Sequence, residues 1–297
     1  MNELDRNAWA GYGSTSLFVL LWSSGAIFSK WGLAFASPFA FLEIRSAIAL
    51  LGILLLAPWL RLHLPAGRRE RLYALATGAV LLGAYQIFYL LALELQVTPG
   101  VMATLLGVQP ILTAICLERR LSPSRWCGLG LGLGGLVLVV YERIGLAGLS
   151  WGGMLCGLLA LASITLGSIM QKRIRENPLG TLPLQYLAGL LLCSAFVPFQ
   201  PFRVDWSLGF LVAVGWMGLV ISLLATLLLY RLIARGNLVN VSSLFYLVPA
   251  GTAILDYLVF GNRLAMLSLV GMGLIVLGLL FVFRTPAEAR GKIAETA

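Results

Sequence analysis

Residues 240–254 read NVSSLFYLVPAGTAI, and residues 101–115 read VMATLLGVQPILTAI. The two stretches align without a gap at an offset of 139 positions, so that Pro249 lies over Pro110. Both stretches end in the same three residues, Thr-Ala-Ile. Two copies of one pattern in a single chain indicate an internal repeat.

The match continues on both sides of this stretch. Gly128 and Gly135 lie over Gly271 and Gly278 at an offset of 143, and Pro38 lies over Pro178 at an offset of 140. Matches in the same order at nearly constant offset predict two repeats that cover the whole chain. We expect the first to span residues 1–143 and the second to span residues 144–297, with a short C-terminal tail.

The composition places these repeats in a lipid bilayer. Hydrophobic residues make up 60% of the 297 residues and charged residues 11%, whereas a soluble domain carries about 25% charged residues. This excludes a soluble enzyme, a disordered protein and a nucleic-acid binder. The net charge of +9 comes from basic residues in short loops, which is typical of membrane topology signals and not of a polyanion partner.

Long stretches without Asp, Glu, Lys or Arg mark the predicted helices, because most reach the roughly 20 residues that cross a bilayer. Their apolar runs are continuous, which favours helices over alternating barrel strands. The ten stretches are 7–29, 46–60, 72–93, 95–117, 126–141, 144–171, 177–202, 206–230, 236–255 and 264–283. The first is interpreted as a retained helix, since its flank lacks the basic start of a signal peptide.

The basic residues set the orientation. With the N-terminus in the cytoplasm, 16 of the 21 Lys and Arg residues fall on the cytoplasmic side and 4 on the other, while Arg45 lies within a helix. Both termini are therefore predicted to be cytoplasmic. Five helices per repeat is an odd number, so the second repeat enters the membrane inverted. The sequence thus predicts an all-α integral membrane protein of ten transmembrane helices in two inverted five-helix repeats, the pattern of secondary transporters.

At this point the chain resembles the EamA-type transporters of the drug/metabolite transporter superfamily over roughly residues 12–283. The residues that carry the resemblance are Trp22-Ser23-Ser24-Gly25, residues 240–249 (NVSSLFYLVP) and residues 260–264 (FGNRL). It implies a secondary transporter, most simply an exporter, of amino acids or related amphipathic metabolites, in the inner membrane of a bacterium. A multidrug or toxic-compound efflux carrier is the alternative.

Other classes of function find little support in the residues. No phosphate-binding loop of the GxxxxGK[ST] type occurs, and the four cysteines lie in apolar runs without a CxxC pair. His63 is the only histidine, so an enzyme, a metal site and a cofactor are not expected. A channel remains the less favoured alternative. The glycines near Gly130 predict close helix packing, within a monomer or at a homodimer seam.

Polar and aromatic side chains at mid-depth are expected to line the substrate site. Tyr85 and Tyr89 share one stripe of a helix, and Tyr246 lies about one turn before Pro249. The open alternative is that hydroxyls bond to their own helix and that the rings only pack. The predicted substrate-binding residues are Trp22, Ser23, Tyr85, Gln86, Tyr89, Thr104, Gln109, Ser163, Thr165, Ser242, Ser243 and Tyr246.

Four further residues are expected to act in gating or coupling. Arg45 and Asp256 are ionisable groups within predicted helices, where charge is costly and is usually functional. Pro110 and Pro249 each remove a helical hydrogen bond and are predicted to make their helices easy to bend. The alternatives are that the charges snorkel to the membrane surface or form salt bridges that tie helices together, and that the prolines make fixed kinks.

Overall fold

The computed structural model describes residues 3–97, 99–118, 122–141, 150–174, 179–235, 237–260 and 266–283. Within these ranges the side chains of residues 3–12, 14, 26, 99, 100, 235, 256, 259 and 260 are not described. The described part of the chain is a bundle of helices without a strand that belongs to a sheet. The all-α fold class is therefore confirmed.

The helices of the first repeat cover residues 3–140, and those of the second cover residues 151–283. In chain order the first set is α1 (Glu3–Gly32), α2 (Pro38–Leu56), α3 (Arg68–Gly78), η1 (Ala79–Ala84), α4 (Tyr85–Glu94), α5 (Pro99–Leu106), α6 (Gln109–Leu117) and α7 (Pro123–Val140). The second set is α8 (Trp151–Arg173), α9 (Leu182–Phe196), η3 (Val197–Phe199), α10 (Leu208–Gly215), η4 (Trp216–Ala225), α11 (Thr226–Arg235), α12 (Leu238–Ser243), η5 (Leu244–Tyr246), α13 (Leu247–Phe260) and α14 (Met266–Phe283).

Eight described helical segments are long and apolar enough to cross a membrane, and residues 101–117 form a shorter apolar segment. The eight are Pro38–Leu56, Arg68–Glu94, Pro123–Val140, Trp151–Arg173, Leu182–Phe199, Leu208–Ala234, Leu238–Leu255 and Met266–Phe283. Large apolar side chains point outward from them; Leu55 and Leu258, for example, are 75% and 69% exposed. Such a surface suits lipid and not water.

Several membrane-length helices are locally irregular at corresponding places in the two repeats. A π-helical segment, η1, joins α3 to α4, and another, η4, joins α10 to α11. The turn at Gly107 and Val108 separates α5 from α6, and the tight turn η5 separates α12 from α13. Pro110 and Pro249 lie in the first turn of the second member of each pair, where a proline costs little.

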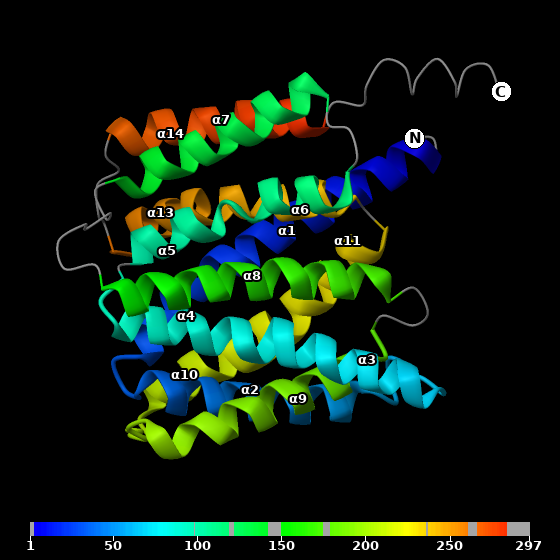
Figure 1. Cartoon of the computed structure of the whole chain (residues 1–297), viewed down its shortest axis with the longest axis vertical. Coiled ribbons are helices and arrows are strands. Elements are labelled where there is room, and N and C mark those ends of the chain that lie inside the picture. The colour runs from blue at the N-terminus through cyan, green and yellow to red at the C-terminus, as the bar shows by residue number, and fades with distance from the viewer. Residues whose placement is uncertain are drawn as a thin grey trace.

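The connections hold one end of the bundle together. Ser37 N–H donates to Arg203 O (2.9 Å) and Asp205 N–H donates to Phe35 O (2.7 Å), so the α1–α2 and α9–α10 connections run side by side. Ser150, the N-cap of α8, donates from Oγ to Leu95 O (2.7 Å) just after α4. Figure 1 shows the start of α1 and the end of α14 at the opposite end.

Helices α7 and α14 form a separate antiparallel pair along one edge of the bundle (Figure 1). Their backbones approach each other at four glycines, where a Cβ atom would lie within 3 Å of the other helix: Gly128, Gly135, Gly271 and Gly278. Small residues permit this approach, which confirms packing within the bundle as their role. Gly130, Gly134 and Gly273 have no neighbour within 4 Å of an added Cβ.

Candidate functional site

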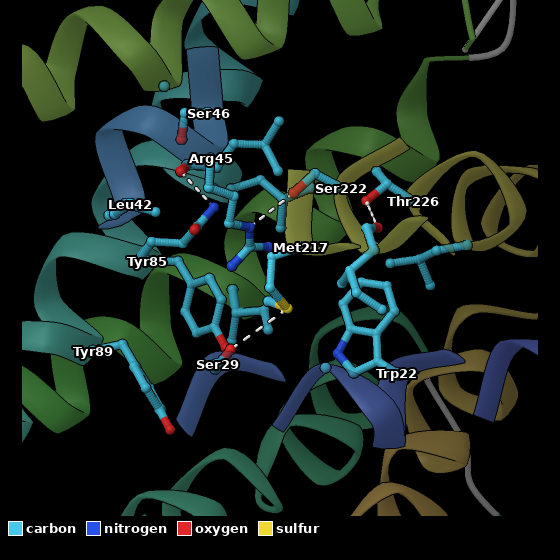
Figure 2. Close-up of a pocket in the computed structure, with 18 of the residues that line it drawn as sticks. Trp22, Ser29, Leu42, Arg45, Ser46, Tyr85, Tyr89, Met217, Ser222 and Thr226 are labelled. Carbon is cyan, nitrogen blue, oxygen red and sulfur yellow. Dashed lines mark hydrogen bonds between the residues drawn. The ribbon is translucent and has the colours of Figure 1, made fainter. Parts of the chain in front are cut away.

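A cavity of 1240 Å³ lies in the middle of the bundle, between helices of both repeats (Figure 2). Its volume exceeds the roughly 300–1,000 Å³ of most ligand pockets. The described lining residues come from α1, α2, η1, α4, α6, α8, α9, η4, α11, α12, η5 and α13. None of them comes from the edge helices α7 and α14, which therefore support the cavity without forming its wall.

The two ends of the cavity differ in exposure. At the end where α1 finishes, the lining includes Lys30 and Leu33, which are both exposed. At the other end it includes Ile233 and Leu238, which are 2% and 3% exposed and pack with Ile169 in one apolar cluster. We interpret the cavity as accessible at the end of α1, where its lining is exposed, and as sealed at the start of α12, where its lining is buried.

Aromatic rings form much of the wall near the accessible half. The rings of Tyr85 and Tyr89 lie 6.1 Å apart between centroids, on one face of α4. Trp22, on α1, contacts the ring of Phe245 edge-on, with centroids 5.4 Å apart. Figure 2 shows both tyrosines on one side of the pocket and Trp22 on the other. These rings can hold the apolar body of a ligand between them.

One positive side chain reaches the middle of the cavity. Arg45, on α2, lines it and donates from Nε to Ser222 Oγ (2.8 Å) on η4. This bond crosses from the first repeat to the second. Glu43, two residues earlier, instead accepts a hydrogen bond from Ser194 Oγ (2.5 Å) on α9 and does not line the cavity. Arg45 therefore points into the cavity between the helices.

Seven of the sequence-predicted residues are brought together in this cavity. They are Trp22, Arg45, Tyr85, Gln86, Tyr89, Gln109 and Ser242. Gln109 donates to Ser168 Oγ (3.3 Å) on α8, which joins two helices of the wall. Predicted residues of both repeats thus lie around one cavity. Whether these residues bind substrate stays a prediction.

The other predicted binding residues do not line the described cavity. Several of them use their hydroxyl groups in hydrogen bonds to backbone oxygens instead. Ser23 donates to Val248 O (3.2 Å) and ties α1 to α13. Thr165 and Ser243 donate to backbone oxygens one turn earlier in their own helices, Leu161 O and Val239 O. Thr165 and Ser243 thus bond to their own helices, which was the alternative for them, whereas Ser23 bonds to a different helix. Ser163 lies on the wall helix α8 and Thr104 lies on α5, and neither side chain lines the cavity.

Tyr246 is the largest departure from the expected site. Its side chain is 1% exposed and belongs to the apolar cluster around α7 and α14, where a Cβ on Gly132 would lie 2.6 Å from its ring. Its ring therefore faces away from the cavity, and the expectation that it forms a main wall is corrected. Pro110 and Pro249 do not line the cavity either. The side chain of Asp256 lies outside the described part of the chain.

The structure adds lining residues that sequence reasoning missed. Ser222, Thr226 and Tyr230 follow one another at four-residue spacing along η4 and α11 and all line the cavity. The same helical periodicity that selected Tyr85 and Tyr89 applies to them. Tyr186, on α9, lines the cavity as well and donates its hydroxyl to Ser222 O. Among the described residues, no three His, Cys, Asp or Glu side chains gather to hold a metal ion.

The sequence model of the EamA-like transporter family matches this chain twice, over residues 9–141 and over residues 151–284. The chain belongs to the EamA-like transporter family. This confirms the resemblance recognised in the sequence and the two-repeat architecture, and with the apolar helices it indicates an integral membrane protein that transports. The expected boundary between residues 143 and 144 stays a prediction.

Two individual proteins are similar over most of their length. The "Uncharacterized transporter YvbV" of Bacillus subtilis (strain 168) is 24% identical over 277 residues, which are 90% of this chain and 89% of that protein. A solved crystal structure superimposes with a TM-score of 0.77 at 20% identity and covers 91% of this chain and 95% of its own. The second likeness shows the fold alone.

Proposed function

We propose that this EamA-family protein is a secondary transporter that exports small amphipathic metabolites, such as amino acids or related compounds, by alternating access. One observation carries the proposal: the large central cavity is lined by both repeats, accessible from one end and sealed at the other. A carrier needs a binding site with a gate on each side, so that the site opens to only one side of the membrane at a time. A continuous pore, as a channel requires, does not fit the sealed end.

The proposed topology has ten membrane-crossing segments, with both termini in the cytoplasm of a bacterial cell. Eight segments are the apolar spans, the ninth is residues 101–117, and the tenth is α1. In this topology successive segments cross the membrane in alternate directions. The paired connections after α1 and α9 and the contact between Leu95 and Ser150 support it, because all of them lie at one end of the bundle. On this topology the accessible end of the cavity faces outward.

The size and walls of the cavity favour a second candidate, a multidrug or toxic-compound efflux carrier. A 1240 Å³ cavity with Trp22, Tyr85 and Tyr89 in its wall has room for drug-sized apolar molecules. The two candidates differ in what they accept: a metabolite exporter discriminates among small polar compounds, whereas an efflux carrier accepts unrelated apolar ones.

Counterflow in proteoliposomes tests the proposal. Liposomes that hold purified protein and a high internal concentration of an unlabelled metabolite should accumulate the labelled metabolite transiently and saturably. Protein-free liposomes and protein inactivated by heat are the controls. Flux that rises linearly with concentration would indicate a channel, and the absence of counterflow across panels of metabolites and drugs would refute both carrier functions.

A further inference from the structure

The charged side chain of Arg45 lies between the helices. Arg45 lies seven residues after Pro38, the first residue of α2, which places it about 10 Å along the helix axis from that end. Its side chain extends between Tyr85 and Met217 and reaches Ser222 (Figure 2). A guanidinium at this depth sits in a much lower dielectric than water, where an unpaired charge is costly.

The guanidinium has one hydrogen-bond partner among the described residues. Its Nε donates to Ser222 Oγ, while no hydrogen bond joins Nη1 or Nη2 to any described group. No described carboxylate forms an ion pair with it, because Glu43 on the same helix faces Ser194 of α9. The bond at Nε holds the planar group in one orientation and leaves its outer edge toward the cavity.

The described lining of the cavity holds no acidic side chain that could balance Arg45. Its described lining residues include Arg45 and Lys30 and include no Asp or Glu. A ligand with a negative group would offset the unpaired charge of Arg45, whereas a cation would add to it. A carboxylate matches the two Nη groups in a bidentate arrangement that a guanidinium favours.

We infer that Arg45 is the anion-binding subsite of this cavity and that the transported compound is an organic carboxylate with an apolar or aromatic body. The inference rests on the transport function proposed above and narrows its substrate class. The carboxylate contacts Nη1 and Nη2, and the body lies against Tyr85 and Tyr89. An α-amino group finds no described carboxylate in the wall, so it adds no ion pair, and lipophilic cations are disfavoured.

Three ligands that share a phenyl ring and differ in charge test this. The purified protein is titrated in detergent with 3-phenylpropionate (an anion), phenylalanine (a zwitterion) and phenethylamine (a cation), and binding is followed by calorimetry. The anion should bind tightest, the zwitterion no tighter, and the cation at least about tenfold more weakly, the size of one charge-assisted hydrogen bond. Equal affinity for all three, or no binding of the anion, would overturn the inference.

Variants locate the subsite. Arg45→Gln should weaken 3-phenylpropionate binding by about tenfold or more, and Arg45→Lys should weaken it less, because it keeps the charge and loses the bidentate contact. Arg69→Gln, at the exposed start of α3, removes the same charge outside the cavity and should leave affinity unchanged. If Arg45→Gln does not yield a monodisperse protein, the affinity of Arg45→Lys for 3-phenylpropionate is the test. Wild-type affinity in the folded Arg45 variants would place the anion elsewhere.

Binding and flux separate this inference from the proposed function. Carboxylate binding that depends on Arg45, without counterflow in liposomes, would refute transport and leave the subsite in place. Counterflow of the phenethylammonium cation that is unchanged in Arg45→Gln would refute the subsite and leave transport in place.

Discussion

Gly128 and Gly278 meet backbone to backbone across α7 and α14. A Cβ on Gly128 would lie 2.6 Å from Gly278 O, and a Cβ on Gly278 would lie 2.6 Å from Gly128 O. Gly135 and Gly271 form a second such pair, at 2.5 and 2.6 Å. The sequence repeat places Gly128 over Gly271 and Gly135 over Gly278, so exchanging the two repeats turns one pair into the other. The helix pair therefore has an approximate two-fold axis between its members.

This contact predicts opposite effects of the same substitution at neighbouring glycines. Gly128→Ala and Gly135→Ala should each destabilise the protein by about 1–3 kcal/mol, because the new methyl group meets backbone that cannot move alone. Gly130→Ala should leave stability unchanged or raise it by up to about 1 kcal/mol, since nothing lies within 4 Å and alanine favours helix. Thermal unfolding in detergent measures both, and equal shifts at Gly128 and Gly130 would contradict the pairing.

A polar cluster joins the repeats at the sealed end of the cavity. Arg125 donates from Nη1 to both oxygens of Glu118 (2.8 and 2.7 Å) and from Nη2 to Asn240 Oδ1 (2.7 Å), and Asn237 donates to Glu118 Oε1 (3.0 Å). The cluster thus connects the end of α6 and the start of α7 to α12. The side chains of Arg125 and Glu118 are only 15% and 16% exposed, so solvent screens the pair less than a surface ion pair.

We expect Arg125→Gln to open the sealed end, because it removes the charge that holds α12 against α6. The measurement is the rate of maleimide labelling of Leu238→Cys in a background without the four native cysteines. Labelling should become several-fold faster in Arg125→Gln. Arg173→Gln, at the exposed end of α8, removes the same charge and should have no effect. An unchanged rate in Arg125→Gln would mean that the apolar cluster alone closes this end.

The helices and one face of the site could be predicted from sequence because they depend on local patterns. Eight of the ten charge-free segments overlap the eight long apolar helices, and Tyr85 and Tyr89 lie side by side as their four-residue spacing predicts. The sequence also placed Arg45 within a helix, and it lies within α2. Its partner Ser222 could not be inferred, because that contact depends on how two distant helices pack.

Irregular helix turns explain two of the errors. The turn η5 has about 3.0 residues per turn, so Tyr246 is rotated relative to Ser242 from where regular α-helix would put it. Ser242 lines the cavity and Tyr246 faces Gly132. On η4, in the same repeat, Leu224 is 50% exposed and does not line the cavity. The π-helical segment η4 is longer than η1, and Ser222 and Thr226 take the cavity face instead.

The breaks before Pro110 and Pro249 predict a hinge. Each proline lies in the first turn of the second half of an interrupted helix. Replacing either proline with alanine supplies the N–H that can bond across the break to the preceding helix. The break should then be stiffer, so turnover should fall more than substrate affinity weakens. Counterflow rate and calorimetric affinity, measured on the same preparation, separate the two effects. Unchanged flux in both variants would argue for fixed kinks.

The proposed topology predicts that both termini are cytoplasmic. A green fluorescent protein fused after Ala297 should fluoresce, and alkaline phosphatase at the same site should be inactive, because the first folds in the cytoplasm and the second needs the oxidising periplasm. The same pair of fusions after Gln200, in the connection between η3 and α10, should give the opposite result. Active phosphatase at Ala297 would reverse the orientation and make the accessible end of the cavity face inward.

The tyrosines provide a test that separates the site from the core. Tyr85→Ala and Tyr89→Ala remove parts of the cavity wall, so each should weaken substrate affinity several-fold with little loss of stability. Tyr246→Ala leaves a void beside Gly132 in a well-packed cluster and should cost about 3–5 kcal/mol of stability.

Tyr246→Phe serves as the matched control for the buried ring. The Tyr246 hydroxyl is buried without a hydrogen bond to a described group, so its removal should leave stability unchanged or raise it. Affinity in Tyr246→Phe should equal that of the wild type, because the ring keeps its place against α7. Reduced affinity in Tyr246→Phe at wild-type stability would mean that this tyrosine reaches the substrate after all, in a state of the transport cycle in which η5 has rotated.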